Sequence, residues 1–503
     1  MILKVKGNRA WSLVAALLLA FLSMSGALGA TGTRAQTELR PANPYGVNIF
    51  LHKEVEEWKI DQTLRMISEA NIAWVKQEFP WQEIEFRKGY FHDDKWDKSA
   101  WEKFDKIVNI AEKYDLNVIA RIDHEPEWAR ANDESGPLVN NRDLADFINA
   151  FLDHYEGRIN YIQVWNEPNL AAEWVPGRAV DPAEYAQMLK DIYPLVKQEH
   201  PNAIILSAPM AMTLEGPEAR GNMNEIDYWN GLYDAGVKGN FDVATANGYG
   251  LDQPPDAPPS PDVLNFRRVE LLREVMVNNG DASRSIWLNE YAWNASPETL
   301  AEEERNYWRH VTPEQQAEWT VEGIEYARDN WPWAGVVLIW YFRQVGDVPP
   351  EKAEYYFAMV NPDFTTQPVY DTVKTAASNY PGPAVQPEPQ PTNPAPTVTT
   401  EPAAPTATTE TAATPTTQAT QAAASATPAP LTPTATPQAP TPTAAAPTPA
   451  PTQAAADPTT TAVAGANTGG GNNTLLFVLG GLLVVGGLAA LGFYFMRSKT
   501  ATE

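Results

Sequence analysis

Two glutamates stand at the ends of short apolar stretches, and asparagine precedes each of them. Glu167 follows Tyr161–Asn166 and comes directly before Pro168, while Glu290 follows Ser285–Asn289. Because proline lacks a backbone donor and has a fixed φ, a paired strand cannot continue through Pro168. A carboxylate at a strand end is held by a rigid element and can point into a cleft. Two such carboxylates, far apart in sequence, are what a carboxylate pair needs to hydrolyse a glycosidic bond. A surface loop that contains Asn-Glu-Pro is the alternative for the first stretch.

The elements that must position these carboxylates alternate along residues 43–380. Eight apolar stretches are predicted strands: Tyr45–Leu51, Ile72–Glu78, Asn117–Ile122, Tyr161–Asn166, Ala203–Pro209, Phe241–Gly248, Ser285–Glu290 and Gly335–Tyr341. Most are rich in Val and Ile and nearly continuous in apolar character, as strands buried on both faces are.

Amphipathic helical patterns lie between the predicted strands. Apolar residues recur at helical spacing in residues 101–114 and 144–155. The stretches Asp181–Glu184 and Thr312–Gln315 each offer an N-cap, a proline at the first helical position and a capping-box partner. Further helices fit residues 55–70, 223–235, 263–278 and 367–378.

Strands that alternate with helices in this way predict an α/β fold, a (β/α)8 TIM barrel. A doubly wound open sheet is the alternative. No Gly-x-Gly-x-x-Gly follows any predicted strand, so the usual sign of a nucleotide-binding sheet is missing. In a barrel the C-terminal strand ends converge on one mouth, so Glu167 from the fourth strand and Glu290 from the seventh are expected to face the same cleft.

The composition restricts partners and cofactors. The 503-residue chain has a net charge of −26, nearly all of it before residue 380, because the segment from Tyr380 to Arg497 is poor in charged residues. Such an acidic surface repels nucleic acid and favours neutral or cationic partners. The chain contains no cysteine, so disulfides and thiolate metal sites are impossible. The six histidines show no His-x-x-x-His spacing, so no metal and no other cofactor is predicted, and only an all-oxygen calcium site stays open.

The segments outside the predicted barrel have distinct compositions. Residues 1–30 carry basic residues, an apolar run and then small residues, which predicts a signal peptide, with an uncleaved anchor as the alternative. Residues 381–473 are rich in Pro, Thr and Ala without apolar periodicity, which predicts a disordered linker. Residues 474–496 are apolar and long enough for one membrane crossing, and the basic tail 497–503 is predicted to be cytoplasmic. The sequence therefore predicts a single-pass cell-membrane protein with the barrel (31–380) on the extracellular face.

The residues around the two glutamates resemble those of the clan A glycoside hydrolases, a superfamily with catalytic glutamates on strands 4 and 7. The resemblance rests on Trp165-Asn166-Glu167-Pro168 and Trp287-Leu288-Asn289-Glu290, and it covers roughly residues 43–380. The stretch 74–90 is similar to the second-strand region of families 5 and 39.

The resemblance implies that Glu167 is the general acid/base and Glu290 the nucleophile of a retaining mechanism. In such a mechanism the two carboxyl groups lie about 5–5.5 Å apart. Like charge at that distance raises the pKa of one partner and keeps an acid protonated near neutral pH.

The resemblance also implies substrate-binding roles. Asn166 matches the asparagine that bonds the sugar 2-hydroxyl, Tyr249 a tyrosine that orients the nucleophile, and Trp340 an aromatic platform under the sugar. Packing is the alternative for Tyr249 and Trp340. Lys76 stands where many members have arginine, and Asn247 where many have histidine. Because Lys and Arg are not equivalent in a hydrogen-bond network, these departures leave the subfamily and substrate open.

Three further tryptophans, Trp81, Trp128 and Trp293, are candidates for lining additional subsites, with ordinary packing as the alternative for each. The resulting hypothesis is a membrane-tethered, retaining O-glycosyl hydrolase that acts on extracellular poly- or oligosaccharides and has a monomeric barrel. A non-catalytic carbohydrate-binding protein and a stalked structural protein are the alternatives. The intact pair of carboxylates argues against the first, because a binding protein needs no such pair. The sequence specifies neither the sugar and linkage nor endo or exo action.

Overall fold

The computed structural model of the chain describes residues 39–130, 137–216, 221–346 and 348–383. The predicted signal peptide, the linker from residue 384 onward, the membrane helix at 474–496 and the tail lie outside these residues. Among the described residues, none of the helices has the length and apolar character that a membrane crossing needs.

Eight parallel strands form one sheet in the order β7-β6-β5-β2-β1-β10-β9-β8. The strands are β1 (Tyr45–Ile49), β2 (Trp74–Glu78), β5 (Asn117–Ile122), β6 (Tyr161–Val164), β7 (Ile204–Leu206), β8 (Ala244–Asn247), β9 (Ile286–Tyr291) and β10 (Ala334–Ile339). A parallel bridge joins Leu206, at the end of one edge strand, to Val243, directly before the other. The sheet is therefore a nearly closed barrel, which confirms the predicted α/β barrel and excludes the open doubly wound sheet.

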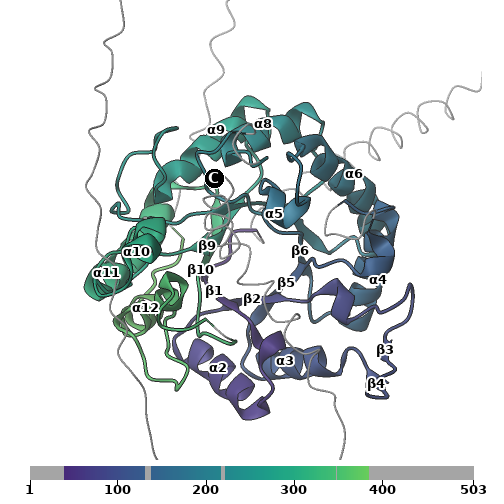
Figure 1. Cartoon of the computed structure of the whole chain (residues 1–503), viewed down its shortest axis with the longest axis horizontal. Coiled ribbons are helices and arrows are strands. Elements are labelled where there is room, and N and C mark those ends of the chain that lie inside the picture. The colour runs from purple at the N-terminus through teal and green to yellow at the C-terminus, as the bar shows by residue number, and fades with distance from the viewer. Residues whose placement is uncertain (1–38, 131–136, 217–220, 347, 384–503) are drawn as a thin grey trace, which may run out of the picture. The chain divides into compact units, whose positions relative to one another are not determined.

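Helices surround this barrel (Figure 1). The longer ones are α2 (Glu57–Glu69), α3 (Glu102–Lys113), α4 (Asn141–His154), α6 (Pro182–Glu199), α8 (Glu225–Asp234), α9 (Val269–Asn278), α11 (Pro313–Asn330) and α12 (Pro368–Ser378). The connections carry the short helices α5 (Ala171–Trp174) and α10 (Glu302–Trp308), the 3₁₀ turns η1 (Leu51–Lys53), η2 (Trp81–Glu83), η3 (Glu127–Ala129), η4 (Phe266–Arg268) and η5 (Ala353–Phe357), and the hairpin β3 (His92–Asp93) and β4 (Lys98–Ser99).

Both predicted helix starts are present. The Asp181 side chain accepts a hydrogen bond from the Ala183 amide at the start of α6. At the start of α11, Thr312 and Gln315 form a reciprocal capping box. These contacts satisfy backbone donors that have no partner within the helix, and each such cap typically contributes about 1 kcal/mol.

The inside of the barrel changes from apolar to polar along the strands. Seven buried residues close its floor: Trp74, Ile119, Leu206, Val243, Trp287, Val336 and Leu338. Since side chains alternate between the two faces of a strand, Lys76 and Glu78 share the face of Trp74 and lie successively nearer the strand end. Polar groups of this next layer bond one another, and Asn289 donates to Gln163 Oε1 at 2.6 Å. The barrel therefore has an apolar floor beneath a polar mouth.

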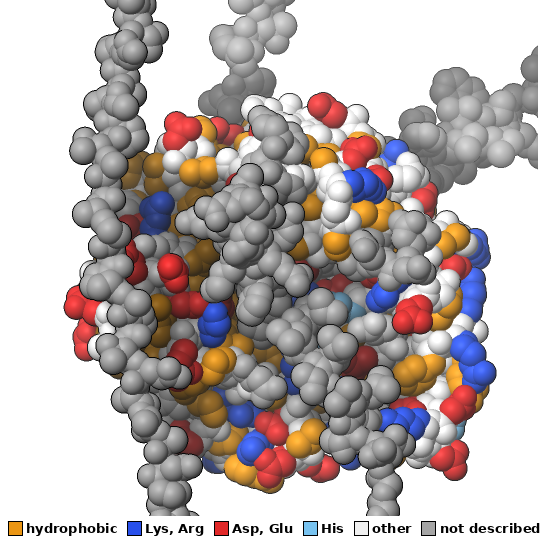
Figure 2. Space-filling view, in the orientation of Figure 1, with side chains coloured by type: hydrophobic (Ala, Val, Ile, Leu, Met, Phe, Trp, Pro, Cys, Tyr) orange, Lys and Arg blue, Asp and Glu red, His pale blue; other side chains and the backbone are white. Residues whose placement is uncertain are grey.

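The outer surface carries charges of both signs. Figure 2 shows Asp and Glu side chains spread around the rim of the face that it draws, interspersed with Lys and Arg. Many of these are exposed ion pairs, such as Arg65 with Glu69 at 3.0 Å. Exposed pairs of this kind contribute little to stability, so the closed apolar core holds the fold.

Candidate active site

Glu167 lies just beyond the end of β6, on a backbone bent away from the strand direction. Trp165 and Glu167 have positive φ angles of 72° and 39°, which non-glycine residues rarely adopt. Backbone contacts hold this bend, since the Glu167 amide donates to Pro209 O at 3.1 Å. The Glu167 side chain is buried, and Asn247 at the end of β8 donates to its Oε1 at 2.7 Å. Strain of this kind is typical of functional sites.

Glu290 lies near the end of β9 and is also buried. The Tyr249 hydroxyl donates to Glu290 Oε2 at 2.7 Å. The Lys76 ammonium, from β2, lies 3.6 Å from Glu290 Oε1 and also donates to the Asn289 side chain. The segment after β8 and the strand β2 therefore place a donor and a cation against this carboxylate.

The electrostatics of the two carboxylates are coupled. Burial and then the neighbouring charge of Glu290 raise the pKa of Glu167 well above the usual value, against the opposing effects of Arg121 and Lys76. Burial lowers the pKa of Lys76 to about 8, although Glu290 opposes that change. The surroundings of Glu167 thus favour its protonated form, whereas Glu290 lies against the Lys76 ammonium.

The sequence-predicted asparagines and Trp340 surround the same site. The Oδ1 atoms of Asn166 and Asn247 are buried and accept no hydrogen bond from any described residue. Trp340 follows β10, its amide donates to Tyr291 O at 3.0 Å, and its partly buried ring lies 5.9 Å from the Lys76 ammonium. The structure therefore places Asn247 against Glu167, Tyr249 and Lys76 against Glu290, and Trp340 beside Lys76, while Asn166 adjoins Glu167 in the chain.

The three other tryptophans predicted to line subsites are more deeply buried or lie outside these contacts. Trp81 is fully buried and stacks on Phe147 with ring centroids 5.4 Å apart. Trp293 is also fully buried, and its indole N–H donates to Gln253 O at 2.7 Å. Neither presents an exposed ring face to a ligand, so their contacts match the packing alternative. Trp128 stays half-buried on η3.

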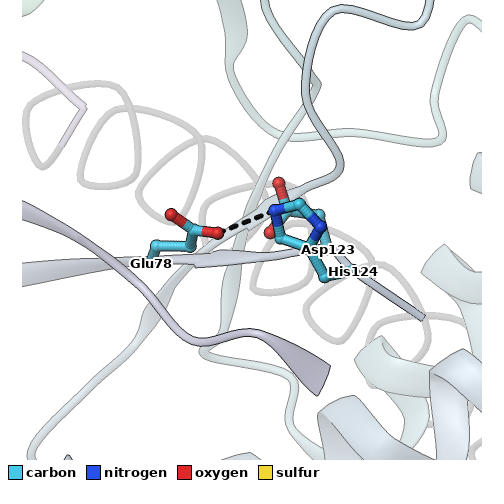
Figure 3. Close-up of side chains that lie close together, drawn as sticks. All are labelled: Glu78, Asp123 and His124. Atoms are coloured by element: carbon cyan, nitrogen blue, oxygen red, sulfur yellow. Dashed lines mark ion pairs between the residues drawn. The ribbon is translucent and has the colours of Figure 1, made fainter. Parts of the chain in front are cut away.

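A second polar cluster lies at the ends of β2 and β5, and its residues were not among those predicted from the sequence. Figure 3 shows Glu78, Asp123 and His124 side by side, with the ion pair between His124 Nε2 and Glu78 Oε1 at 2.9 Å. Arg121 donates to Asp123 Oδ2 and so orients that carboxylate. Neither Glu78 nor Asp123 follows an asparagine, so the Asn-Glu pattern does not select them, although Glu78 ends a predicted strand and Asp123 directly follows one.

Opposite charges hold this cluster together. Although burial opposes ionisation, Arg121 and His124 hold the pKa of Glu78 well below the usual range. Burial lowers the pKa of His124, but Asp123 and Glu78 outweigh it and raise that pKa to about 9. Glu78, Asp123 and His124 each offer a ligand atom within 4.8 Å of the others, a donor set that suits a divalent cation. Arg121 and protonated His124 already supply positive charge there.

Residues 34–240, which include Glu167 and end before β8, match the family model described as Cellulase (glycosyl hydrolase family 5). No curated protein sequence matches the chain significantly.

Among solved structures, a family 39 glycoside hydrolase from the gut symbiont Bacteroides cellulosilyticus WH2 is similar, with a TM-score of 0.50 and 21% identity over 68% of this chain. The match spans 64% of that protein. GH5_18 from Streptomyces cattleya, solved in complex with GlcNAc, has a TM-score of 0.51 and 15% identity over 69% of this chain and 83% of its own.

The structural likenesses show the barrel fold, and the family model covers less than half of the chain. The chain therefore resembles the clan A glycoside hydrolases, with similarity to families 5 and 39.

Proposed function

We propose that this protein is a retaining glycoside hydrolase in which Glu167 is the general acid/base and Glu290 the nucleophile. The observation that carries the proposal is the unlike surroundings of the two buried carboxylates. Burial and the charge of Glu290 raise the pKa of Glu167 well above its usual value, while Tyr249 and Lys76 lie against Glu290. One carboxyl group is thus prepared to give a proton and the other to attack carbon.

In the first step a Glu290 oxygen forms a bond to the anomeric carbon while the bond to the leaving oxygen breaks. The Glu167 proton passes to that leaving oxygen. In the second step Glu167 takes a proton from water, the water oxygen attacks the anomeric carbon, and the ester bond to Glu290 breaks. Because the ester carries no charge, the repulsion that raises the pKa of Glu167 is relieved at the stage where Glu167 must act as a base.

The neighbouring residues take supporting roles. Tyr249 fixes the Glu290 carboxylate through its 2.7 Å hydrogen bond. Asn166 has a buried acceptor oxygen without a partner among the described residues, and it is proposed to bond the sugar 2-hydroxyl. Trp340 provides an aromatic face for the sugar. Asn247 holds Glu167 in place.

The proposed substrates are neutral or cationic poly- or oligosaccharides outside the cell, in keeping with the net charge of −26. The test is a panel of 4-nitrophenyl β-glycosides and of plant and microbial glycans, with released phenolate and reducing ends as the readout. We expect turnover of at least one glycoside. Saturable binding of a glycan without release of any product would instead favour the non-catalytic carbohydrate-binding protein.

The cellular location is also a proposal, which rests on residues 1–30 and 474–503. A signal sequence, an apolar segment of 23 residues at 474–496 and the basic Arg497 and Lys499 behind it favour a single-pass protein with its barrel outside. We predict that a chain ending at residue 473 appears in the medium with unchanged specific activity, measured against the full-length protein in the membrane fraction. Retention of the shortened chain by the membrane would contradict the single C-terminal anchor.

A further inference from the structure

Glu173 is a carboxylate near the catalytic residues to which the proposed mechanism gives no role. It lies on the short helix α5, in the connection that runs from Glu167 at the end of β6 to α6. Figure 1 shows α5 inside the ring of outer helices, beside β6. Its place in the chain therefore puts it at the mouth of the barrel.

The helix that carries Glu173 is firmly held. Trp174, the next residue, is fully buried, and its ring centroid lies 5.3 Å from that of Trp165. The Trp174 indole N–H donates to Glu184 Oε2 at 2.9 Å. At the start of the helix, the Ala171 amide donates to Asn222 Oδ1 at 2.9 Å. These contacts fix the backbone of α5 and so give the Glu173 carboxylate a defined place.

The Glu173 carboxylate is only partly exposed, and it forms no hydrogen bond or ion pair with any of the described residues. The charges that act on it are those of Arg121, His124, Asp123 and Glu290, all at the barrel mouth. Because α5 follows Glu167 in the connection beyond β6, its fixed backbone places this carboxylate on the mouth side of the barrel (Figure 1), where the catalytic residues lie. Burial raises the pKa of Glu173, against Arg121 and His124.

We propose that Glu173 is a substrate-binding residue whose carboxylate accepts a hydrogen bond from a sugar hydroxyl in the catalytic cleft, and that it selects substrates carrying this hydroxyl. The inference rests on the proposed glycosidase function and adds a specificity residue to it. A sugar hydroxyl is a donor of a kind that this carboxylate does not find among the described residues. Hydrogen bonds to an ionised acceptor are short and strong, so one bond of this kind discriminates sharply between substrates with and without the hydroxyl.

The test uses the full-length Glu173→Gln variant and the 4-nitrophenyl β-glycoside that the wild type hydrolyses fastest. We expect kcat/KM to fall by roughly 10- to 100-fold, the usual effect of losing a hydrogen bond to a charged group. Glu127→Gln, which changes an exposed carboxylate on the neighbouring turn η3, serves as the matched control and should keep wild-type kcat/KM. Both variants should unfold at the wild-type temperature.

A set of monodeoxy analogues of the same glycoside, and an oligosaccharide with the same glycone, then locate the hydroxyl. If the hydroxyl belongs to the sugar that is transferred, one deoxy analogue should lower the kcat/KM of the wild type by the same factor by which Glu173→Gln lowers kcat/KM on the parent glycoside. Glu173→Gln should then cause no further loss on that analogue. If it belongs to the leaving group, Glu173→Gln should slow only the oligosaccharide.

Unchanged kcat/KM of Glu173→Gln on both the glycoside and the oligosaccharide would overturn the assignment. The assignment would also be overturned if Glu173→Gln lowered kcat/KM by the same factor on the parent glycoside, on every deoxy analogue and on the oligosaccharide. Such a uniform loss would mean that no single hydroxyl contacts Glu173. Failure of the wild type to hydrolyse any substrate would instead refute the proposed function, so the two failures are distinguishable.

Discussion

The Glu290→Ala variant should lose turnover by roughly 10⁴-fold or more, because no side chain then attacks the anomeric carbon. Sodium azide should restore part of the rate with a substrate that has an activated leaving group. The anion fits the space vacated by the carboxylate and attacks from the same face. The product should be a glycosyl azide of inverted configuration relative to the substrate, as established by NMR.

The surroundings of Glu290 predict that this variant stays folded. Its side chain bonds Tyr249 and Lys76 at the polar mouth, while the apolar floor of the barrel around Trp287 is left intact. The unfolding temperature of the variant checks this. A folded variant with wild-type kcat would remove Glu290 from the mechanism.

The Glu167→Ala variant should separate substrates by their leaving groups. A 2,4-dinitrophenyl glycoside needs no proton on departure, so its glycosylation rate should stay near the wild-type value. An alkyl glycoside or oligosaccharide should lose about 10²–10⁴-fold, the usual contribution of a general acid. Azide should yield a glycosyl azide of retained configuration here, because Glu290 still performs the first displacement. Equal losses for both classes of leaving group would contradict the acid role.

The pH dependence supplies a second readout for the same variant. The pKa of Glu167 is raised well above the usual value by burial and by Glu290, so its acid form persists to a pH above the usual carboxyl range. Wild-type kcat/KM for a poor leaving group should therefore hold near neutral pH and fall as the pH rises through the pKa of Glu167. With the dinitrophenyl substrate, Glu167→Ala should lack this alkaline loss.

The barrel and the strand-end positions of the two glutamates could be predicted from the sequence because both follow from simple patterns. Apolar stretches that alternate with amphipathic ones predict parallel strands with covering helices, and the capped starts at Asp181 and Thr312 are purely local signals. Asn-Glu at two strand ends then places Glu167 and Glu290 at one mouth. Nothing in this reasoning depends on long-range packing.

The rest of the site depends on contacts that no local pattern shows. Trp81 and Trp293 are fully buried, whereas Trp340 is only partly buried, although all three tryptophans follow strand ends. The bend at Glu167 is set by its bond to Pro209, a residue beyond the next strand. Glu173 lies on a four-residue helix without a distinctive sequence signature, and only its fixed place beside the cleft gives it a proposed role.

Covalent labelling tests the central claim most directly. The wild-type protein is incubated with the 2-deoxy-2-fluoro analogue of its best glycone carrying a 2,4-dinitrophenyl leaving group, because the fluorine slows breakdown of the glycosyl-enzyme more than its formation. We predict that the intact mass rises by one fluoroglycosyl group and that peptide mapping places the ester on Glu290. A protein that hydrolyses the parent glycoside with inversion and takes up no label, or that carries the label on another residue, would contradict the proposed mechanism.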